Sequence, residues 1–331
     1  MRKVRVAVAG AGAFGRNHIR VVRECPSAEL AGIIETDPAR AAAVSAEFGC
    51  PILRLDQVAG RADAAIVAVP TTAHTEVGCA LLEAGLDILV EKPIATDPAS
   101  ARRLIQTAAT HGRLLQVGHL ERFNPAVIAL RKALTLPLFF EIHRLSVFSP
   151  RSLDVDVVRD LMIHDLDIVL SFTGEPPEEI RAAGISILSR KVDIASARLA
   201  FSNGCVANLT ASRVSTERVR KLRLFQPRQY ISLDYARQDA AVFEVGSSNG
   251  VPQISHRMLP VDKGEPLRLE LESFFEAVST RSRPAVTGED GLRALEAALA
   301  VVDKIEEHAR RVGHSLAVWK SNENCSPPGR A

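Results

Sequence analysis

A glycine-rich turn near the amino terminus constrains the fold of this chain more than any other feature. The motif at residues 10–15 reads G-A-G-A-F-G, follows a valine-rich strand expected over Val4–Ala9 and opens a helix expected over Ala13–Glu24. In this context the three glycines permit a tight turn, let the backbone approach a pyrophosphate and allow close helix–strand packing. A plain glycine turn is the alternative, but the flanking strand and helix favour a dinucleotide site.

An acidic residue follows at the position of a ribose-binding carboxylate. Glu35 ends the second expected strand, Leu30–Glu35, about 20 residues after the third glycine. A carboxylate there accepts hydrogen bonds from a ribose 2′-hydroxyl and repels a 2′-phosphate, so NAD is favoured over NADP. Asp37 is better explained as the N-cap of a helix that begins at Pro38. The residues expected to contact the cofactor are Gly10, Gly12, Ala13, Phe14, Gly15, Glu35, Thr71, His74, Glu91 and Lys92.

The first 120 residues alternate between strands and helices. This alternation predicts a Rossmann domain over 1–120, a doubly wound parallel sheet with helices on both faces. Aspartate–proline pairs mark two helix starts, and Gly85 and Gly112 mark helix ends. The further elements expected are strands Ala64–Val69, Asp87–Val90 and Leu114–Val117, and helices Thr71–Ala84 and Asp97–Gly112.

Beyond residue 120 most of the expected strands follow one another without helices between them. This pattern predicts a second, α+β domain over 121–316 with an open-faced, mainly antiparallel sheet. A polar tail over 317–331, with Pro-Pro-Gly, is expected to be irregular. The expected strands are Leu138–Val147, Ile180–Leu188, Ala197–Phe201, Cys205–Ser212, Leu222–Phe225 and Ala240–Val245, and the helices are Asn124–Leu134, Val157–Phe172, Leu267–Thr280 and Gly291–His308.

Composition excludes several classes of function. With 41 Lys and Arg against 39 Asp and Glu, the net charge is only +2 and no basic stripe suggests a nucleic-acid partner. No apolar run has the length of a membrane helix, so no membrane partner is expected. Five cysteines without a C-x-x-C pair fit reduced thiols and a cytoplasmic location.

Two segments carry the candidate chemistry. Lys92 follows a strand end, which is where an open α/β sheet binds its ligands. The segment 156–171 is apolar except for one helical stripe, and a buried polar stripe must face a partner or a cavity. The stripe consists of Asp156, Asp160, His164, Asp167 and Ser171.

These residue types suit the oxidation of an alcohol. A histidine side chain ordinarily titrates near neutrality, so His164 can accept the hydroxyl proton. Asp160, one helical turn away, can orient it, and Lys92 can stabilise alkoxide character. The alternatives are a structural His–Asp pair and a metal cluster. Because hydride chemistry needs no metal and no matching His/Cys spacing occurs elsewhere, no metal is predicted.

The glycine loop, Glu91-Lys92-Pro93 and the Asp160…His164…Asp167 segment together resemble the glucose–fructose oxidoreductase/inositol dehydrogenase (Gfo/Idh/MocA) family over the whole chain. The resemblance implies NAD as cofactor and a catalytic trio of Lys92, Asp160 and His164. Met162 stands where the family usually has glycine. We expect its side chain to narrow the space beside His164 and to disfavour free sugars.

The segment Gly118–Pro125 is similar to the branch of UDP-N-acetylglucosamine 3-dehydrogenases, which supply 3-amino sugars for lipid A and related glycans. This resemblance implies a sugar-nucleotide substrate and an aminotransferase that acts on the product. An ion pair between Glu121 and Arg122 at a helix start is the alternative use of these side chains. The substrate-binding candidates are His119, Arg122, Asn124 and Arg151.

Three functions therefore compete: a sugar-nucleotide dehydrogenase, a dehydrogenase of free polyols or sugars such as inositol, and a non-enzymatic NAD-binding sensor. The complete Lys92–Asp160–His164 trio argues against the sensor. An exposed sheet face in the second domain would need covering, so a homodimer or homotetramer is expected.

Overall fold

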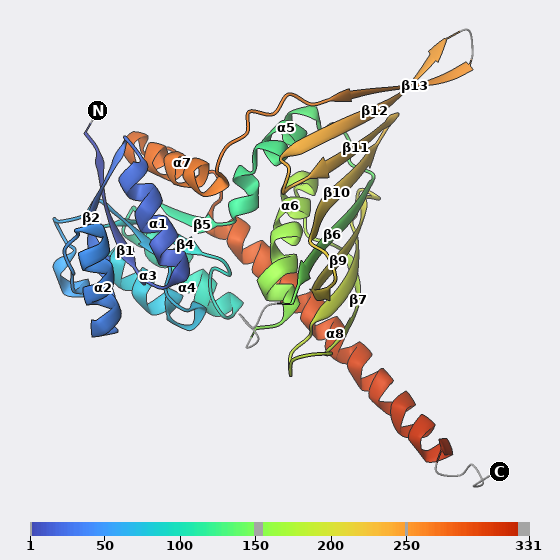
Figure 1. Ribbon diagram of the computed structural model, residues 1–331, viewed down its shortest axis with the longest axis horizontal. Helices are drawn as coiled ribbons and strands as arrows, with labels where there is room; N and C mark the ends of the chain where they lie inside the picture. Colours follow the sequence, from blue (N-terminus) through green and yellow to red (C-terminus); the bar gives the residue numbers. More distant parts are fainter. Residues whose placement is uncertain (1, 149–154, 249–250, 324–331) are drawn as a thin grey trace.

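The computed structural model describes residues 2–148, 155–248 and 251–323, which form two units, each built on one sheet (Figure 1). The first sheet is parallel, with strand order β2-β1-β3-β4-β5 and helices on both faces. The predicted Rossmann arrangement is confirmed. Its strands are β1 (Val4–Ala9), β2 (Ala28–Ile34), β3 (Ala64–Val67), β4 (Asp87–Glu91) and β5 (Leu115–Gly118), and its helices are α1 (Ala13–Glu24), α2 (Pro38–Phe48), α3 (His74–Glu83) and α4 (Pro98–Thr110).

Local sequence signals explain where these helices begin. The side chains of Asp37 and Asp97 accept hydrogen bonds from backbone N–H groups of the first turn of α2 and α4. Each is followed by a proline at the first helical position, where the missing N–H costs nothing. The helix predicted from Thr71 begins later, because Thr71–Ala73 forms a separate 3₁₀ turn after Pro70. A further short 3₁₀ turn spans Leu55–Gln57.

The second sheet is mainly antiparallel, as predicted, in the order β13-β12-β11-β10-β6-β9-β8-β7, with only β6 and β9 parallel. Two of its strands, β11 and β13, were not predicted. Every residue of β13 is exposed, so no alternation of buried and exposed residues marks it in the sequence. The strands are β6 (Phe139–Val147), β7 (Glu179–Ile185), β8 (Ile194–Ala200), β9 (Val206–Ser215), β10 (Val219–Gln226), β11 (Gln229–Asp234), β12 (Asp239–Ser248) and β13 (Val251–Met258).

The sheet has an inner face, which packs on helices, and an outer face without them (Figure 1). Phe140 and Ile142 of β6 and Leu222 of β10 lie on the inner face, in one core with α6 (Ile163–Thr173). A π-helical turn over Val158–Met162 precedes α6. The connection to the first sheet consists of a 3₁₀ turn, Leu120–Phe123, and α5 (Pro125–Ala133).

The last two helices return to the first unit. Helix α7 (Pro266–Thr280) buries Leu271 and Phe274 in the core beside β1 and α1, so it packs on the Rossmann sheet although it falls within predicted domain 121–316. Helix α8 (Gly288–Glu323) runs along the second unit and projects beyond it (Figure 1). The helix is longer than predicted and includes 317–323 of the expected tail, because no proline interrupts the sequence before Pro327.

Over the described ranges, no helix is long and apolar enough to cross a bilayer. The four cysteines that the structure describes, Cys25, Cys50, Cys79 and Cys205, are buried free thiols.

Candidate active site

A groove of about 680 Å³ runs over the carboxyl ends of β1, β2 and β3 and is lined by Gly10, Gly12, Ala13, Phe14 and Glu35. Its glycines divide into two kinds. A Cβ on Gly10 or Gly15 would lie 2.5 Å or less from a backbone carbonyl oxygen, so both are required for packing. A Cβ on Gly12 would meet nothing within 4 Å, so this turn leaves open space at the helix N-terminus for a pyrophosphate.

Glu35 occupies the ribose end of the groove and is surrounded by donors. Its carboxylate accepts hydrogen bonds from the backbone N–H groups of Ala11 (2.9 Å), Thr36 (2.8 Å) and Asp37 (3.0 Å), and from the guanidinium of Arg40 (2.9 Å). Burial raises the pKa of Glu35, but Arg40 and the backbone donors outweigh burial and hold that pKa at about 2. The carboxylate is therefore ionised over the physiological pH range, as discrimination against a 2′-phosphate requires.

A second cavity of about 500 Å³ adjoins this groove and shares Phe14, Ala68, Val69 and Pro70 with it. Lys92, Asp160 and His164, which are far apart in the sequence, all line it. The carboxyl end of β4 supplies Lys92, and the π turn and the start of α6 supply the other two. The predicted trio is thus assembled from both sheet units at the edge where α/β sheets bind ligands.

Lys92 is held by the π turn. Its Nζ donates to the backbone carbonyl of Asp160 at 2.7 Å and lies 3.5 Å from the carboxylate Oδ1 of the same residue. Both side chains remain partly exposed in the cavity, so the ammonium can still reach a substrate oxygen. The arrangement presents a fixed cation with a carboxylate beside it.

His164 is a neutral imidazole. Burial and the nearby charges of Lys92 and Arg144 lower its pKa well below 6.5. Its Nδ1 is buried without a hydrogen-bond partner, and Nε2 makes no hydrogen bond within the described ranges. A neutral ring with a free nitrogen in the cavity can accept a proton.

The structure differs from the predicted stripe in two ways. The π turn adds a residue to the helical turn, so Asp160 and His164 are out of the α-helical i, i+4 register, and no hydrogen bond joins them in the described structure. Met162 points into the apolar core of the second unit and is fully buried, whereas Leu161 lines the cavity. The prediction that Met162 narrows the space beside His164 is therefore wrong.

Three of the predicted substrate residues, His119, Arg122 and Asn124, lie beside the cavity but do not line it. Arg122 donates twice to Asp167, at 2.7 Å each, and Asn124 caps α5 and donates to Glu121 and the Tyr235 carbonyl. Arg122 is therefore not paired with Glu121, contrary to the predicted alternative.

His119 and Arg151 complete the predicted substrate residues. The His119 ring lies edge-on to His164, with centroids 6.5 Å apart, and is fully buried without a partner in the described structure. Arg151 lies outside the described residues.

Sequence reasoning missed a charged network under the cavity. Arg144 of β6, fully buried, donates to both carboxylate oxygens of Asp165 (2.7 and 2.8 Å) and to Glu121 (2.8 Å), and its guanidinium lies 5.0 Å from the Tyr235 ring centroid. Arg220 of β10 also lines the cavity. A signal was present: Arg144 occupies an inward position of an apolar alternating strand, after Phe140 and Ile142.

Two other residues predicted to contact the cofactor, Glu91 and His74, form hydrogen bonds within the protein. Glu91 lines the cavity, accepts a hydrogen bond from His18 (2.7 Å) and lies against Gly118, where a Cβ would come within 3.0 Å of its oxygens. Both ring nitrogens of His74 face carbonyl oxygens, those of Pro93 (2.9 Å) and Val69 (3.0 Å). His74 thus ties together the ends of β3 and β4. Thr71 lines the same cavity.

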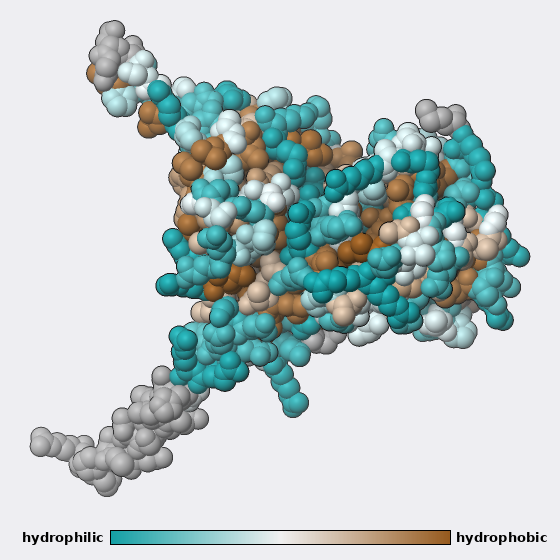
Figure 2. Space-filling view, turned by 180° about the vertical axis from the view of Figure 1, so that it is seen from behind, coloured by the Kyte–Doolittle hydropathy of each residue, from teal (hydrophilic) through white to brown (hydrophobic). Residues whose placement is uncertain are grey.

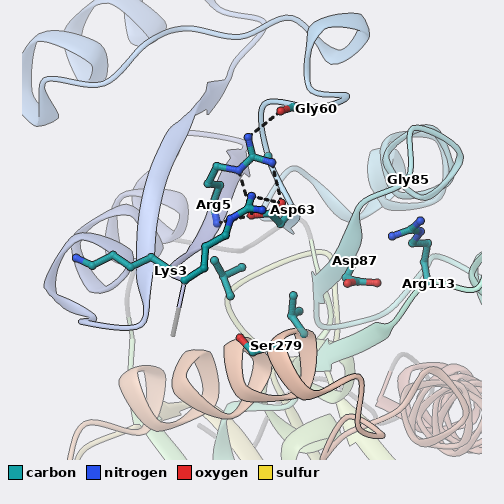
Figure 3. A pocket seen from close by; sticks show the side chains of 12 residues that line it. Lys3, Arg5, Gly60, Asp63, Gly85, Asp87, Arg113 and Ser279 are labelled. Carbon is teal, nitrogen blue, oxygen red and sulfur yellow. Dashed lines mark hydrogen bonds and ion pairs between the residues drawn. The ribbon is translucent and has the colours of Figure 1, made fainter.

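A third hollow, of about 570 Å³, lies at the opposite edge of the first sheet (Figure 3). It is surrounded by the amino ends of β1, β3 and β4, and its most prominent cation, Arg5, is already bonded to Asp63 (2.8 Å) and Gly60 (2.7 Å). Parallel sheets bind ligands at the carboxyl ends, so the hollow has no part in the site. In the described part of the chain, no three His, Cys, Asp or Glu side chains gather as metal ligands.

Comparison with known proteins agrees with this geometry. Residues 4–119 match the oxidoreductase family with an NAD-binding Rossmann fold, and residues 144–229 match the GFO/IDH/MocA C-terminal domain. The UDP-N-acetylglucosamine 3-dehydrogenase of Acidithiobacillus ferrooxidans is 36% identical over 315 residues, covering 94% of this chain and 100% of that relative. An inositol 2-dehydrogenase of Rhizobium meliloti is 27% identical and covers 92% of this chain and 97% of its own length.

Solved structures show that the similarity includes the three-dimensional fold. The A. ferrooxidans enzyme, GnnA, superposes with a TM-score of 0.88 at 35% identity, over 93% of this chain and 99% of that chain. An oxidoreductase from Agrobacterium radiobacter in complex with NAD⁺ shares the fold, with a TM-score of 0.79 at 18% identity over 92% and 96% of the two chains. The chain therefore belongs to the GFO/IDH/MocA oxidoreductase family, and its first domain is an NAD-binding Rossmann domain.

Proposed function

We propose that this enzyme oxidises the 3-hydroxyl of UDP-N-acetylglucosamine to a ketone, with NAD as the hydride acceptor. The observation that carries the proposal is the meeting of Lys92, Asp160 and His164 in one cavity that adjoins the dinucleotide groove. The likeness to the A. ferrooxidans UDP-N-acetylglucosamine 3-dehydrogenase over nearly the whole chain supports the choice of substrate.

The cavity residues divide the work of the oxidation. The hydroxyl proton passes to Nε2 of neutral His164, and the Lys92 ammonium stabilises negative charge on the oxygen as the C=O bond forms. Asp160 positions Lys92 through its carbonyl and its carboxylate. NAD, when bound, accepts the hydride from the carbon.

The residues that line the dinucleotide groove suit NAD. Gly12 leaves room for the pyrophosphate, and the ionised carboxylate of Glu35 can accept hydrogen bonds from the ribose hydroxyls. In the free protein the guanidinium of Arg40 donates to the same carboxylate. Because the Arg40 side chain is 45% exposed, it can move aside, and the ribose hydroxyls then donate to Glu35 in place of the guanidinium.

The test is turnover. The purified enzyme is incubated with NAD, glutamate, UDP-N-acetylglucosamine and an aminotransferase that acts on the 3-keto sugar, and the 3-amino product is sought by mass spectrometry. The aminotransferase removes the ketone, which is expected to be higher in energy than the alcohol, and so draws the reaction forward. Absence of this product, together with brisk NADH formation from inositol or free glucose, would favour a polyol dehydrogenase, the function of the R. meliloti relative.

The same proposal sets the cellular context. A 3-keto sugar nucleotide is a substrate for an aminotransferase, and the resulting 3-amino sugar would serve lipid A or a related glycan. We place the enzyme in the cytoplasm, where NAD and nucleotide sugars are available. Fractionation of cells that express the protein, with activity assayed in each fraction, tests the location.

We also propose that the outer face of the second sheet joins two copies of the chain. An aromatic row crosses it through direct cross-strand neighbours, with ring centroids 4.8 to 5.7 Å apart: Phe139, Phe225, Tyr230, Phe243 and His256. Figure 2 shows apolar surface on the half of the molecule that carries the protruding β12–β13 hairpin. Phe243→Glu is expected to yield a monomer in sedimentation experiments, whereas a monomeric unmodified protein would contradict this assembly.

A further inference from the structure

Arg220 and Arg144 form a pair of like charges on neighbouring strands. They are direct partners in the antiparallel register of β10 and β6, in line with the pairs Leu222–Ile142 and Leu224–Phe140. All three pairs lie on the inner face of the sheet. Like charges directly opposite each other are destabilising, so this position requires compensation.

Only one of the two arginines has hydrogen-bonded acids within the described structure. Arg144 is paired with Asp165 and Glu121. The side chain of Arg220 makes no hydrogen bond or ion pair with any described residue, and its half-buried guanidinium has a buried Nε without a partner. Burial and the charge of Arg144 lower the pKa of Arg220, and the charges of Glu121 and Asp165 oppose this shift only in part.

The guanidinium without a hydrogen-bonded partner lies in the catalytic cavity. Arg220 lines it together with Lys92 and His164, and the charge of Arg220 contributes to lowering the pKa of His164. The acids that line the cavity have nearer partners: Asp160 has Lys92, Glu121 has Arg144 and Glu91 has His18. Among the cations that line this cavity, Arg220 is therefore the one whose guanidinium has no hydrogen-bonded acid in the described part of the chain, and its donors remain available to a ligand.

We propose that Arg220 binds the diphosphate of the substrate and so selects sugar nucleotides over neutral polyols. This inference rests on the proposed function and names the group that would recognise its substrate. A guanidinium binds phosphate oxygens through two parallel hydrogen bonds. Arg218, two residues earlier and exposed, adds a second positive charge near Arg220. A neutral polyol would offer no anionic oxygen to the donors of Arg220.

The experiment measures binding of UDP, which has the diphosphate but no sugar, to enzyme saturated with NADH. Saturation fills the dinucleotide groove, so UDP cannot bind at the glycine loop. Arg220→Met removes the charge and keeps much of the side-chain length. Arg223→Met is the matched control, because Arg223 belongs to the same strand, lies on the outer face and pairs with Glu141.

Arg220→Met is expected to weaken UDP binding in calorimetry by about 10- to 100-fold, the loss of a charge-assisted hydrogen-bonded pair. KM for UDP-N-acetylglucosamine should rise by a similar factor, with a smaller change in kcat, and Arg223→Met should match the unmodified enzyme. Ligand-free Arg220→Met should unfold at the same or a higher temperature, since a repulsion is removed. A lower unfolding temperature would instead assign Arg220 a structural role and overturn the proposal.

Two results separate failure of this inference from failure of the proposed function. If the enzyme oxidises UDP-N-acetylglucosamine and Arg220→Met binds UDP as tightly as the unmodified protein, the function stands and the role of Arg220 is wrong. If the enzyme oxidises inositol and not UDP-N-acetylglucosamine, the proposed function fails. UDP binding then still decides for or against a phosphate site at Arg220.

Discussion

The site has a cofactor half, the groove over the carboxyl ends of β1, β2 and β3, and a substrate half, the cavity that holds Lys92 and His164. The charged side chains of the two halves are paired in different ways. In the cofactor half, the Glu35 carboxylate takes three backbone N–H groups and the guanidinium of Arg40. In the substrate half, the charges meet side chain to side chain: Arg144 hydrogen-bonds two acids, whereas Arg220 hydrogen-bonds none within the described ranges.

This difference indicates where specificity resides. Backbone donors come with the turn after β1 and β2, so any sequence that forms the turn provides them. Side-chain pairs depend on residues brought together from different strands, and each can be changed alone. The cofactor half is therefore complete before the ligand binds, whereas the substrate half keeps a guanidinium, that of Arg220, without a hydrogen-bonded partner in the described ranges.

The largest expected effect concerns the chemical step, where the two halves meet. His164→Asn removes the proton acceptor and should lower turnover by at least 10²- to 10⁴-fold, the usual contribution of a general base. Lys92→Ala should abolish most turnover as well. NAD affinity, measured by calorimetry, should be nearly unchanged in both. His143→Asn, on an exposed position of β6, is the control. Near-native turnover of His164→Asn would show that the base is another group.

The pH profile provides a second check on His164. Its pKa is lowered well below 6.5, so it remains neutral as the pH falls from 8 to 6.5, and it loses proton-accepting capacity only at lower pH. The acid limb of kcat/KM for alcohol oxidation should therefore lie below pH 6.5. A limb centred above pH 6.5 would contradict the electrostatic environment assigned to this histidine.

The next effect is on stability and contrasts the two kinds of charge pairing. Arg144→Met leaves Asp165 and Glu121 buried without their cation, which typically costs about 3–5 kcal/mol. Arg223→Met breaks an exposed pair with Glu141 and should cost about 1 kcal/mol or less. Urea unfolding of both variants measures the difference. Equal losses would mean that the network under the cavity is not the structural base of the substrate half.

The contrast between local signals and pairs of side chains from distant strands also explains which parts of the site the sequence predicted. The glycine loop, Glu35 and Lys92 are local signals tied to strand ends, and the structure brings them to one edge of the first sheet as expected. Arg220 lies in a strand predicted only from Leu222 onward, so the sequence offered no reason to place it opposite Arg144. Pairing register between distant strands is a tertiary property that periodicity does not reveal.

The predicted spacing of side chains along the helix Val157–Phe172 was wrong for a related reason. In the polar stripe of 156–171, Asp156 and Asp167 are buried, and Asp167 pairs with Arg122. Asp160 and His164 instead line the cavity. The π turn at Val158–Met162 was not predictable, because helical periodicity assumes a constant number of residues per turn. Arg122 was assigned to the substrate from the resemblance of the segment 118–125, with an ion pair to Glu121 as the alternative, whereas the fold supplies Asp167 as its partner.

A smaller effect is expected for cofactor choice. Glu35→Ser removes the acceptor of the ribose hydroxyls and frees Arg40 to bind a 2′-phosphate. NAD affinity should fall about tenfold or more and NADP affinity should rise, so the preference for NAD narrows or reverses. Calorimetry with both cofactors measures the change. Glu47→Ser, an exposed glutamate that pairs with Arg16 outside the groove, is the control. Equal affinity of the unmodified enzyme for NAD and NADP would contradict the role of Glu35.

The smallest effect separates backbone from side-chain donors at Glu35 itself. Its pKa is about 2 in the folded chain against an ordinary value of 4.5, so its contribution to stability is complete above pH 4.5 and is lost as the pH falls toward 2. The difference in unfolding free energy between the unmodified protein and Glu35→Gln should therefore be constant above pH 4.5 and shrink below it. Arg40→Met removes the side-chain donors and keeps those of Ala11, Thr36 and Asp37, so the loss should still begin near pH 4.5 but be smaller and end at a higher pH. If Arg40→Met abolished the pH dependence completely, the carboxylate would owe its low pKa to one side chain, and the cofactor half would be no more preformed than the substrate half.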